Sequence, residues 1–174
     1  MEKEQNKAQK IAPHLWFDNQ AEEAVNFYVS VFKNSEILEL TRYGEAGPGP
    51  KCSVMGISFL LDGQKFMALN GGPHFKFTPA ISFYVNCESQ QEVDELWEKL
   101  TEGGAESQCG WLTDKYGLSW QIIPAVLGEL LHSQDAEKSA RAMQAMLQMR
   151  KIDIAVLQQA YNGQPTSNPA SVIT

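Results

Sequence analysis

The pattern of apolar and polar positions occurs twice along the chain. Residues 13–17 form a short apolar run, and in residues 21–28 the apolar positions recur at the spacing of one helix face. The same order returns in the apolar run 79–85 and the amphipathic segment 93–100. Further strand-like segments follow each copy. The pattern therefore predicts two modules, each consisting of a strand, a helix and three more strands.

Turn signals divide the first copy into its strands. Residues 35–43 alternate weakly, which favours an edge or half-buried strand. Residues 47–50 read Gly-Pro-Gly-Pro and predict a loop, because proline fixes the backbone and lacks a hydrogen-bond donor. Residues 54–61 and 64–69 predict two strands of a hairpin that turns at the intervening Asp-Gly pair.

The pattern becomes helical after Pro124. Residues 136–149 are rich in Ala, Met, Leu and Arg, and Asp153 is suited to cap a final helix that carries Leu157 and Tyr161. The chain ends lack periodicity and are expected to be flexible. The expected organisation is a tail at 1–10, a domain at 11–124 made of modules 11–72 and 79–124, C-terminal helices at 125–161, and a tail at 162–174.

Composition and charge limit the partners that the chain could have. A chain of 174 residues can bury roughly 70% of its unfolded surface, enough for a core without disulfides or metal. The formal charge of -7 disfavours binding to nucleic acid, and no apolar run approaches the length of about 20 residues that spans a bilayer. The three cysteines lack the spacing of a disulfide framework or a zinc site, and residues 1–10 lack the apolar run of a signal peptide. A cytoplasmic protein is therefore expected.

The most specific local motif is Asp-x-x-Gly-x-x-Trp-x-Ile, which begins at Asp114. Together with the duplicated halves, it resembles the glyoxalase, bleomycin-resistance and dioxygenase superfamily, also called the vicinal oxygen chelate superfamily. A closer resemblance, covering about residues 11–161, is to the PhnB-like branch, whose domain is named 3-demethylubiquinone-9 3-methyltransferase. The residues that carry it lie at 17–28, 68–77, 81–83 and 114–122. The resemblance implies an α+β fold in which two βαβββ modules form one curved eight-stranded sheet, with the concave side as a cup for a ligand.

The resemblance also indicates where a metal would bind in relatives that use one. Such relatives place His, Gln or Glu on the inner strands, and the corresponding residues here are Met67, Ser82 and Gln121. Only His14 could supply a strong imidazole ligand, whereas a divalent ion normally needs three or more suitable ligands. We therefore expect no metal. No G-x-G-x-x-G turn follows a strand, so the residues give no support to S-adenosylmethionine binding or to any other cofactor.

Aromatic and sparse polar side chains on the predicted strands and in the linker are the candidates for ligand binding. The predicted cup residues are His14, Trp16, Met67, Asn70, Phe75, Ser82, Trp111, Asp114, Trp120 and Gln121. Each has a structural alternative: core packing for the aromatic rings, a turn for Asp114, and a strand histidine satisfied by backbone or water for His14. The sequence assigns no catalytic residue and does not decide which face of its strand His14 occupies.

The sequence is compatible with three functions. The leading hypothesis is a PhnB-like protein that binds a small, partly apolar molecule in the cup, with metal-independent turnover left open. The alternatives are a metal-dependent lyase, isomerase or dioxygenase that uses His14, and a drug-sequestering protein of the bleomycin-resistance type.

A homodimer is also expected. The superfamily resemblance implies one, and the C-terminal segment is unusually apolar for a helix pair on a complete domain. Its apolar residues are Met143, Met146, Leu147, Met149, Ile154 and Leu157. The alternative is that these residues pack back on their own sheet.

Overall fold

The computed structural model describes residues 9–47 and 49–165. The chain divides into two compact units, Met1–Lys76 and Phe77–Thr174, and each contains its own four-stranded sheet. The tails predicted at 1–10 and 162–174 lie mostly outside the described residues.

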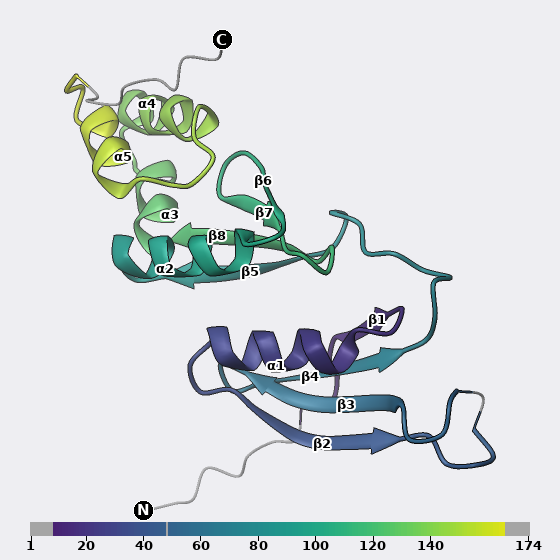
Figure 1. Ribbon diagram of the computed structural model, residues 1–174. Helices are drawn as coiled ribbons and strands as arrows, with labels where there is room; N and C mark the ends of the chain where they lie inside the picture. The colour runs from purple at the N-terminus through teal and green to yellow at the C-terminus, as the bar shows by residue number, and fades with distance from the viewer. Residues whose placement is uncertain (1–8, 48, 166–174) are drawn as a thin grey trace, which may run out of the picture. The chain divides into compact units, whose positions relative to one another are not determined.

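The first unit contains five elements within its described residues. They are β1 (His14–Phe17), α1 (Ala21–Val31), β2 (Glu36–Arg42), β3 (Val54–Leu61) and β4 (Gln64–Asn70). The sheet order is β1-β4-β3-β2, with β1 parallel to β4 and the remaining pairs antiparallel. Helix α1 lies along one face of this sheet (Figure 1). The buried face of the helix includes Val25 and Tyr28, and the strand residues that alternate toward the core include Phe17 and Phe59.

The second unit repeats this arrangement. Its elements are β5 (Ser82–Cys87), α2 (Gln90–Thr101), β6 (Ala105–Glu106), β7 (Trp111–Thr113) and β8 (Ser119–Pro124). The sheet order is β5-β8-β7-β6, and β5 runs parallel to β8. The side chain of Ser89 caps α2 by accepting a hydrogen bond from the backbone N–H of Glu92. The apolar stripe of α2 includes Val93 and Leu100, which are fully buried, so this helix covers one face of its sheet as α1 does in the first unit.

Three further helices follow the second sheet: α3 (Ala125–Leu131), α4 (Ala136–Leu147) and α5 (Ile154–Tyr161). The predicted cap Asp153 accepts a hydrogen bond from the backbone N–H of Val156 at the start of α5. Five buried residues form a core between these helices and the end of β8: Ile123, Leu127, Met149, Ile152 and Leu157. No helix among the described residues is long and apolar enough to span a membrane.

The predicted fold class is confirmed. The chain is an α+β protein of two βαβββ modules with a C-terminal helical extension, and the eight strands of the described residues lie in two sheets of four.

Candidate functional site

Each sheet has one face beneath its helix and one face turned away from it, which we call the open face. In the first sheet, backbone pairing places His14 beside Met67, Met67 beside Ser58, and Ser58 beside Glu39. Residues paired in this way share a face, so these four side chains form one row across the four strands. Leu15 alternates with His14 and is buried on the helix side. The structure therefore places His14 on the open face.

The open face of the first sheet contains a hollow of about 290 Å³. Its lining residues are His14, Glu39, Thr41, Met55, Gly56, Ile57, Ser58, Met67, Ala68 and Leu69. Met55 and Met67 are both exposed, at 42% and 39%. The hollow therefore combines flexible apolar side chains with an imidazole, two hydroxyls and a carboxylate.

Trp16 lies on β1 two residues after His14 and is held by the linker that follows β4. Its indole Nε1 donates a hydrogen bond to the carbonyl oxygen of Gly72 at 2.9 Å. Phe75 stands edge-on to the indole with ring centroids 5.0 Å apart, and 66% of Phe75 is exposed. The ring of Trp16 also passes so close to Gly71 that any side chain at that position would collide with it. Trp16 is thus half-buried at one end of the open face, with Phe75 beside it.

Asn70, a predicted cup residue, lies on the side of the first sheet opposite the open face. It alternates with Leu69, on the side of Ala68 and helix α1. Its side-chain oxygen accepts a hydrogen bond from the backbone N–H of Ala21 at 2.9 Å, and its amide nitrogen donates to the carbonyl of Val54 at 3.3 Å. Since residue 20 provides no side-chain cap, Asn70 replaces that cap and ties α1 to the sheet.

The open face of the second sheet carries a row formed by Trp111, Gln121 and Tyr84. The side-chain amide of Gln121 donates a hydrogen bond to the hydroxyl of Ser82 at 2.8 Å. Tyr84 is 59% exposed, while Trp111, Gln121 and Ser82 are half-buried. Partial burial, with a smaller contribution from Cys87, raises the pKa of the Tyr84 phenol above its ordinary value of 10.0. The phenol is therefore a neutral donor and acceptor at physiological pH.

Asp114 and Trp120 are also absent from the open face. Trp120 is 2% exposed and pairs with Leu112 on the side of the sheet that α2 covers. Its indole Nε1 donates to one carboxylate oxygen of Asp114 at 2.9 Å. The other oxygen accepts from the backbone N–H groups of Tyr116 and Leu118 at 2.9 and 3.0 Å. Asp114 is itself 3% exposed, so this pair organises the turn before β8 and does not face a ligand.

The residues that the family resemblance places at metal positions do not suit a divalent ion. Met67 offers a thioether and Ser82 a hydroxyl, which are weak ligands for such ions. The amide nitrogen of Gln121 is turned toward Ser82. Within the described ranges no group of three or more His, Cys, Asp or Glu side chains could hold a metal ion. The expectation of no bound metal stays a prediction.

Sequence reasoning missed four residues with polar groups on the open faces. Glu39, Thr41 and Ser58 line the hollow, and Tyr84 stands beside Gln121. A hydroxyl at Ser58, in the middle of an otherwise apolar strand, was the available signal. It becomes informative only when the strand order places Ser58 between Met67 and Glu39.

Two βαβββ modules, each with a helix on one face and mixed polar and apolar side chains on the other, define a protein of the glyoxalase superfamily. The chain belongs to the family described as 3-demethylubiquinone-9 3-methyltransferase, whose model matches residues 9–123, within the PhnB-like branch. The resemblance inferred from the sequence is thereby confirmed. No curated protein matches the chain significantly.

Solved structures agree with this assignment. One similar structure is a PhnB protein from Bacillus cereus that is itself described as a 3-demethylubiquinone-9 3-methyltransferase by inference. It is 44% identical with a TM-score of 0.64, and the match covers 67% of this chain and 100% of that one. Protein PA1353 from Pseudomonas aeruginosa is 22% identical with a TM-score of 0.55, over 65% and 95% of the two chains. FosX, a fosfomycin resistance protein from Listeria monocytogenes, is 16% identical with a TM-score of 0.55, over 73% and 99%. The last two similarities establish the fold alone.

Proposed function

We propose that this protein binds a small, partly apolar molecule in the hollow on the open face of its first sheet. The observation that supports this most is the row of His14, Met67, Ser58 and Glu39 across a hollow of about 290 Å³. Ligand pockets typically start at about 300 Å³ and combine an apolar lining with a few polar groups. The hollow suits a molecule of small size.

The lining suggests how such a molecule would be held. Met55, Met67 and Leu69 offer flexible apolar surface to the body of the ligand. His14 and Ser58 can each donate or accept a hydrogen bond, and Glu39 at the far strand accepts. On the second sheet, Gln121 and Ser82 form a comparable polar pair beside Trp111. Binding of this kind requires no metal, and it leaves turnover as a separate question.

The activity in the family description is not part of this proposal. A nucleotide-type cofactor would need a glycine-rich turn with free backbone N–H groups at a helix N-terminus. Two glycines of the loop after β2, Gly47 and Gly49, pack instead against the ring of Tyr43, and an added side chain at either position would collide with that ring. The alternative of a metal-dependent lyase, isomerase or dioxygenase needs ligands that Met67 and Ser82 do not supply.

A charge placed in the hollow tests the proposal. With 1-anilinonaphthalene-8-sulfonate as the probe, we expect saturable binding at one site per chain, measured by the increase in probe fluorescence. Met67→Asp should weaken this binding by roughly tenfold or more, because it places an anion where the anionic, apolar probe would lie. The control is Gln64→Asp, an exposed position on the same strand. Equal probe affinity in the two variants would contradict the proposal.

We further propose that the protein is a homodimer in a reducing compartment, the cytoplasm. All three cysteines are free thiols. Large apolar side chains are exposed in both units, including Met55, Ile81 at 72% and Tyr84. Strands β1 and β5 are edge strands of their own sheets, with one row of backbone groups that no strand within that sheet pairs. Burial of apolar side chains and pairing of edges are the usual means by which two copies associate. The net charge of -7 supports a small-molecule ligand and not a nucleic acid.

A further inference from the structure

The C-terminal helices reach the open face of the second sheet. On β8, Gln121 and Ile123 share that face because side chains alternate along a strand. Gln121 is half-buried, whereas Ile123 is 5% exposed because it packs with Met149, Ile152 and Leu157. The extension therefore closes one end of the open face, two residues from the polar side chain of Gln121.

The segment 149–152, between α4 and α5, is bonded to the residues that lead into Trp111. The backbone N–H of Cys109 donates to the carbonyl of Met149 at 2.8 Å, and that of Gly110 donates to the carbonyl of Arg150 at 2.7 Å. A Cβ at Gly110 would lie 2.6 Å from Ile123 and 3.2 Å from Ile152. The segment thus lies against the residue that immediately precedes Trp111.

Helix α2 holds the same segment from its other side. The side chain of Gln90 donates to the carbonyl of Ile152 at 3.1 Å and accepts from the backbone N–H of Ile154 at 2.8 Å. Lys151 pairs with Asp94 at 2.6 Å, and this hydrogen bond lowers the pKa of the Asp94 carboxyl. The segment is therefore fixed between α2 and the turn before β7.

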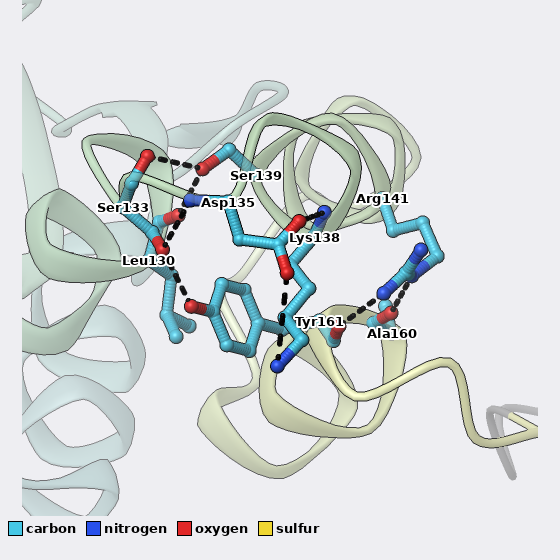
Figure 2. A network of polar contacts seen from close by, with 8 residues as sticks. All are labelled: Leu130, Ser133, Asp135, Lys138, Ser139, Arg141, Ala160 and Tyr161. Carbon is cyan, nitrogen blue, oxygen red and sulfur yellow. Dashed lines mark hydrogen bonds and ion pairs between the residues drawn. The ribbon is translucent and has the colours of Figure 1, made fainter.

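The two helices that flank this segment are also tied to each other (Figure 2). The guanidinium of Arg141 on α4 donates to the carbonyls of Ala160 and Tyr161 on α5 at 3.1 and 2.9 Å. The hydroxyls of Ser133 and Tyr161 lie 2.7 Å apart. Because α4 and α5 are held together, the chain between them has little freedom to move away from the sheet.

We propose that the C-terminal extension positions Trp111 and thereby sets the shape of the open face of the second sheet. Gln90 and Lys151 are positioning residues that act through segment 149–152. The family match ends at residue 123, so segment 149–152 lies beyond the part of the chain that the family model matches, whereas Gln90 and Trp111 lie within it.

Fluorine NMR of the full chain labelled with 5-fluorotryptophan tests the inference. The chain has four tryptophans, and Trp111→Phe identifies the resonance of Trp111. In the double variant Gln90→Ala/Lys151→Ala, we expect the backbone N–H groups of Cys109 and Gly110 to exchange faster with solvent. The Trp111 resonance should shift and broaden. Gln90→Glu retains a side-chain oxygen that can accept from the backbone N–H of Ile154. In combination with Lys151→Ala, it should therefore change the Trp111 resonance less than Gln90→Ala does.

Two controls separate positioning from general destabilisation. Gln91→Ala alters an exposed neighbour whose side chain bonds to Glu95 within α2. Ser89→Ala removes the cap of α2 and lowers stability without touching segment 149–152. Both should leave the Trp111 resonance unchanged.

An unchanged Trp111 resonance in the double variant, with the Cys109 and Gly110 amides exchanging faster, would overturn the inference. An equal shift in Ser89→Ala would overturn it as well. If the double variant leaves those amides protected, Ile152→Ala removes the side chain that packs against Gly110, and the same criteria apply. A wild-type protein that does not bind the probe, but shows the expected response of Trp111, would refute the proposed function alone.

Discussion

A single carboxylate organises the turn that precedes β8. Asp114 accepts hydrogen bonds from two backbone N–H groups and from the indole of Trp120, and it is almost fully buried. Hydrogen bonds to a charged acceptor are stronger than those between neutral groups. Because the donors are buried, leaving any of them without an acceptor would cost stability. The aspartate and the tryptophan of the sequence motif are therefore paired by the fold, which explains their spacing without any contact to a ligand.

Replacing this carboxylate should destabilise the second unit without altering ligand binding. Asp114→Ala leaves three buried or half-buried donors without their acceptor, and we expect the free energy of unfolding to fall by about 2–4 kcal/mol. Trp120→Phe removes one donor and should have a smaller effect. Urea unfolding monitored by circular dichroism measures both. Wild-type stability in Asp114→Ala would mean that the turn does not depend on this carboxylate.

The three cysteines should differ in reactivity. Burial, followed by repulsion from Glu92, raises the pKa of the Cys87 thiol from its ordinary value of 9.0 to about 12. Because the thiolate is the reactive form, Cys87 should resist a disulfide reagent at pH 8 while the exposed Cys52 reacts. The unfolded chain releases this proton at a lower pH than the folded chain, so this contribution to stability is complete below pH 9 and is lost as pH rises toward 12. Mass spectrometry after brief labelling identifies which cysteines react; rapid modification of Cys87 in the folded protein would contradict the prediction.

At the scale of elements, the start of α1 depends on a residue from another strand. Asn70→Ala removes the acceptor for Ala21 and the donor to Val54, and should lower the free energy of unfolding by about 1–2 kcal/mol. Asn26→Ala, an exposed position on α1 whose side chain bonds to the carbonyl of Glu22, is the matched control with an effect near zero. Thermal unfolding measures both variants. Weakened probe binding by Asn70→Ala without loss of stability would return Asn70 to the ligand site.

The elements themselves could be predicted from the sequence because each depends on local information. The apolar run 54–61 and the Asp-Gly turn that follows it correspond to β3 (Val54–Leu61) and its hairpin to β4. The cap at Asp153 could be recognised because a short polar residue precedes an apolar helical stripe. Strand β6 could not, since two exposed residues carry no pattern of their own and pair only after β7 is in place.

The faces of the strands could not be predicted in the same way. A period of two separates neighbouring residues onto opposite faces, but it does not say which set the helix covers. Trp120 and Gln121 are adjacent and therefore lie on opposite faces. The large apolar ring of Trp120 is the one buried under α2, which leaves Gln121 on the open face. His14 and Asn70 required knowledge of their strand partners. His14 lies on the open face because its apolar neighbours on β1 are buried on the other face. Asn70 lies on the helix side because its side chain accepts a hydrogen bond from Ala21 at the start of α1, where no side chain of α1 provides a cap.

At the scale of the whole molecule, we predict that no transition metal remains bound. Thioether, hydroxyl and neutral amide groups at Met67, Ser82 and Gln121 lack the charge and ligand strength of carboxylate or imidazole. Elemental analysis after dialysis against a chelator should give well below one equivalent of zinc, iron, nickel or manganese per chain. Probe binding should be the same before and after dialysis. One equivalent retained after dialysis would revive the metal-dependent alternative.

We also predict a homodimer to which the C-terminal helices contribute little surface. Of their apolar residues, Met149 and Leu157 are buried in the core with Ile123, which leaves Met143 at 40% and Leu147 at 50% as the exposed ones. Most of the apolar residues of this segment are therefore explained by packing of the helices onto their own unit, which was the alternative to a place in the interface. The apolar surface that remains lies mainly on the sheets and the linker, and its burial against a second copy is worth about 25 cal/mol per Å².

Sedimentation at micromolar concentration should therefore give twice the chain mass of 19.4 kDa. Met143→Glu/Leu147→Glu places two charges on the exposed side of α4. If these residues lie at the edge of the interface, the double variant should weaken the dimer by less than roughly tenfold, since rim positions contribute little to affinity. Gln144→Glu, between them in sequence and already polar, is the control. Complete dissociation of the double variant alone would place the helices at the centre of the interface, and a monomeric wild-type protein would refute the dimer.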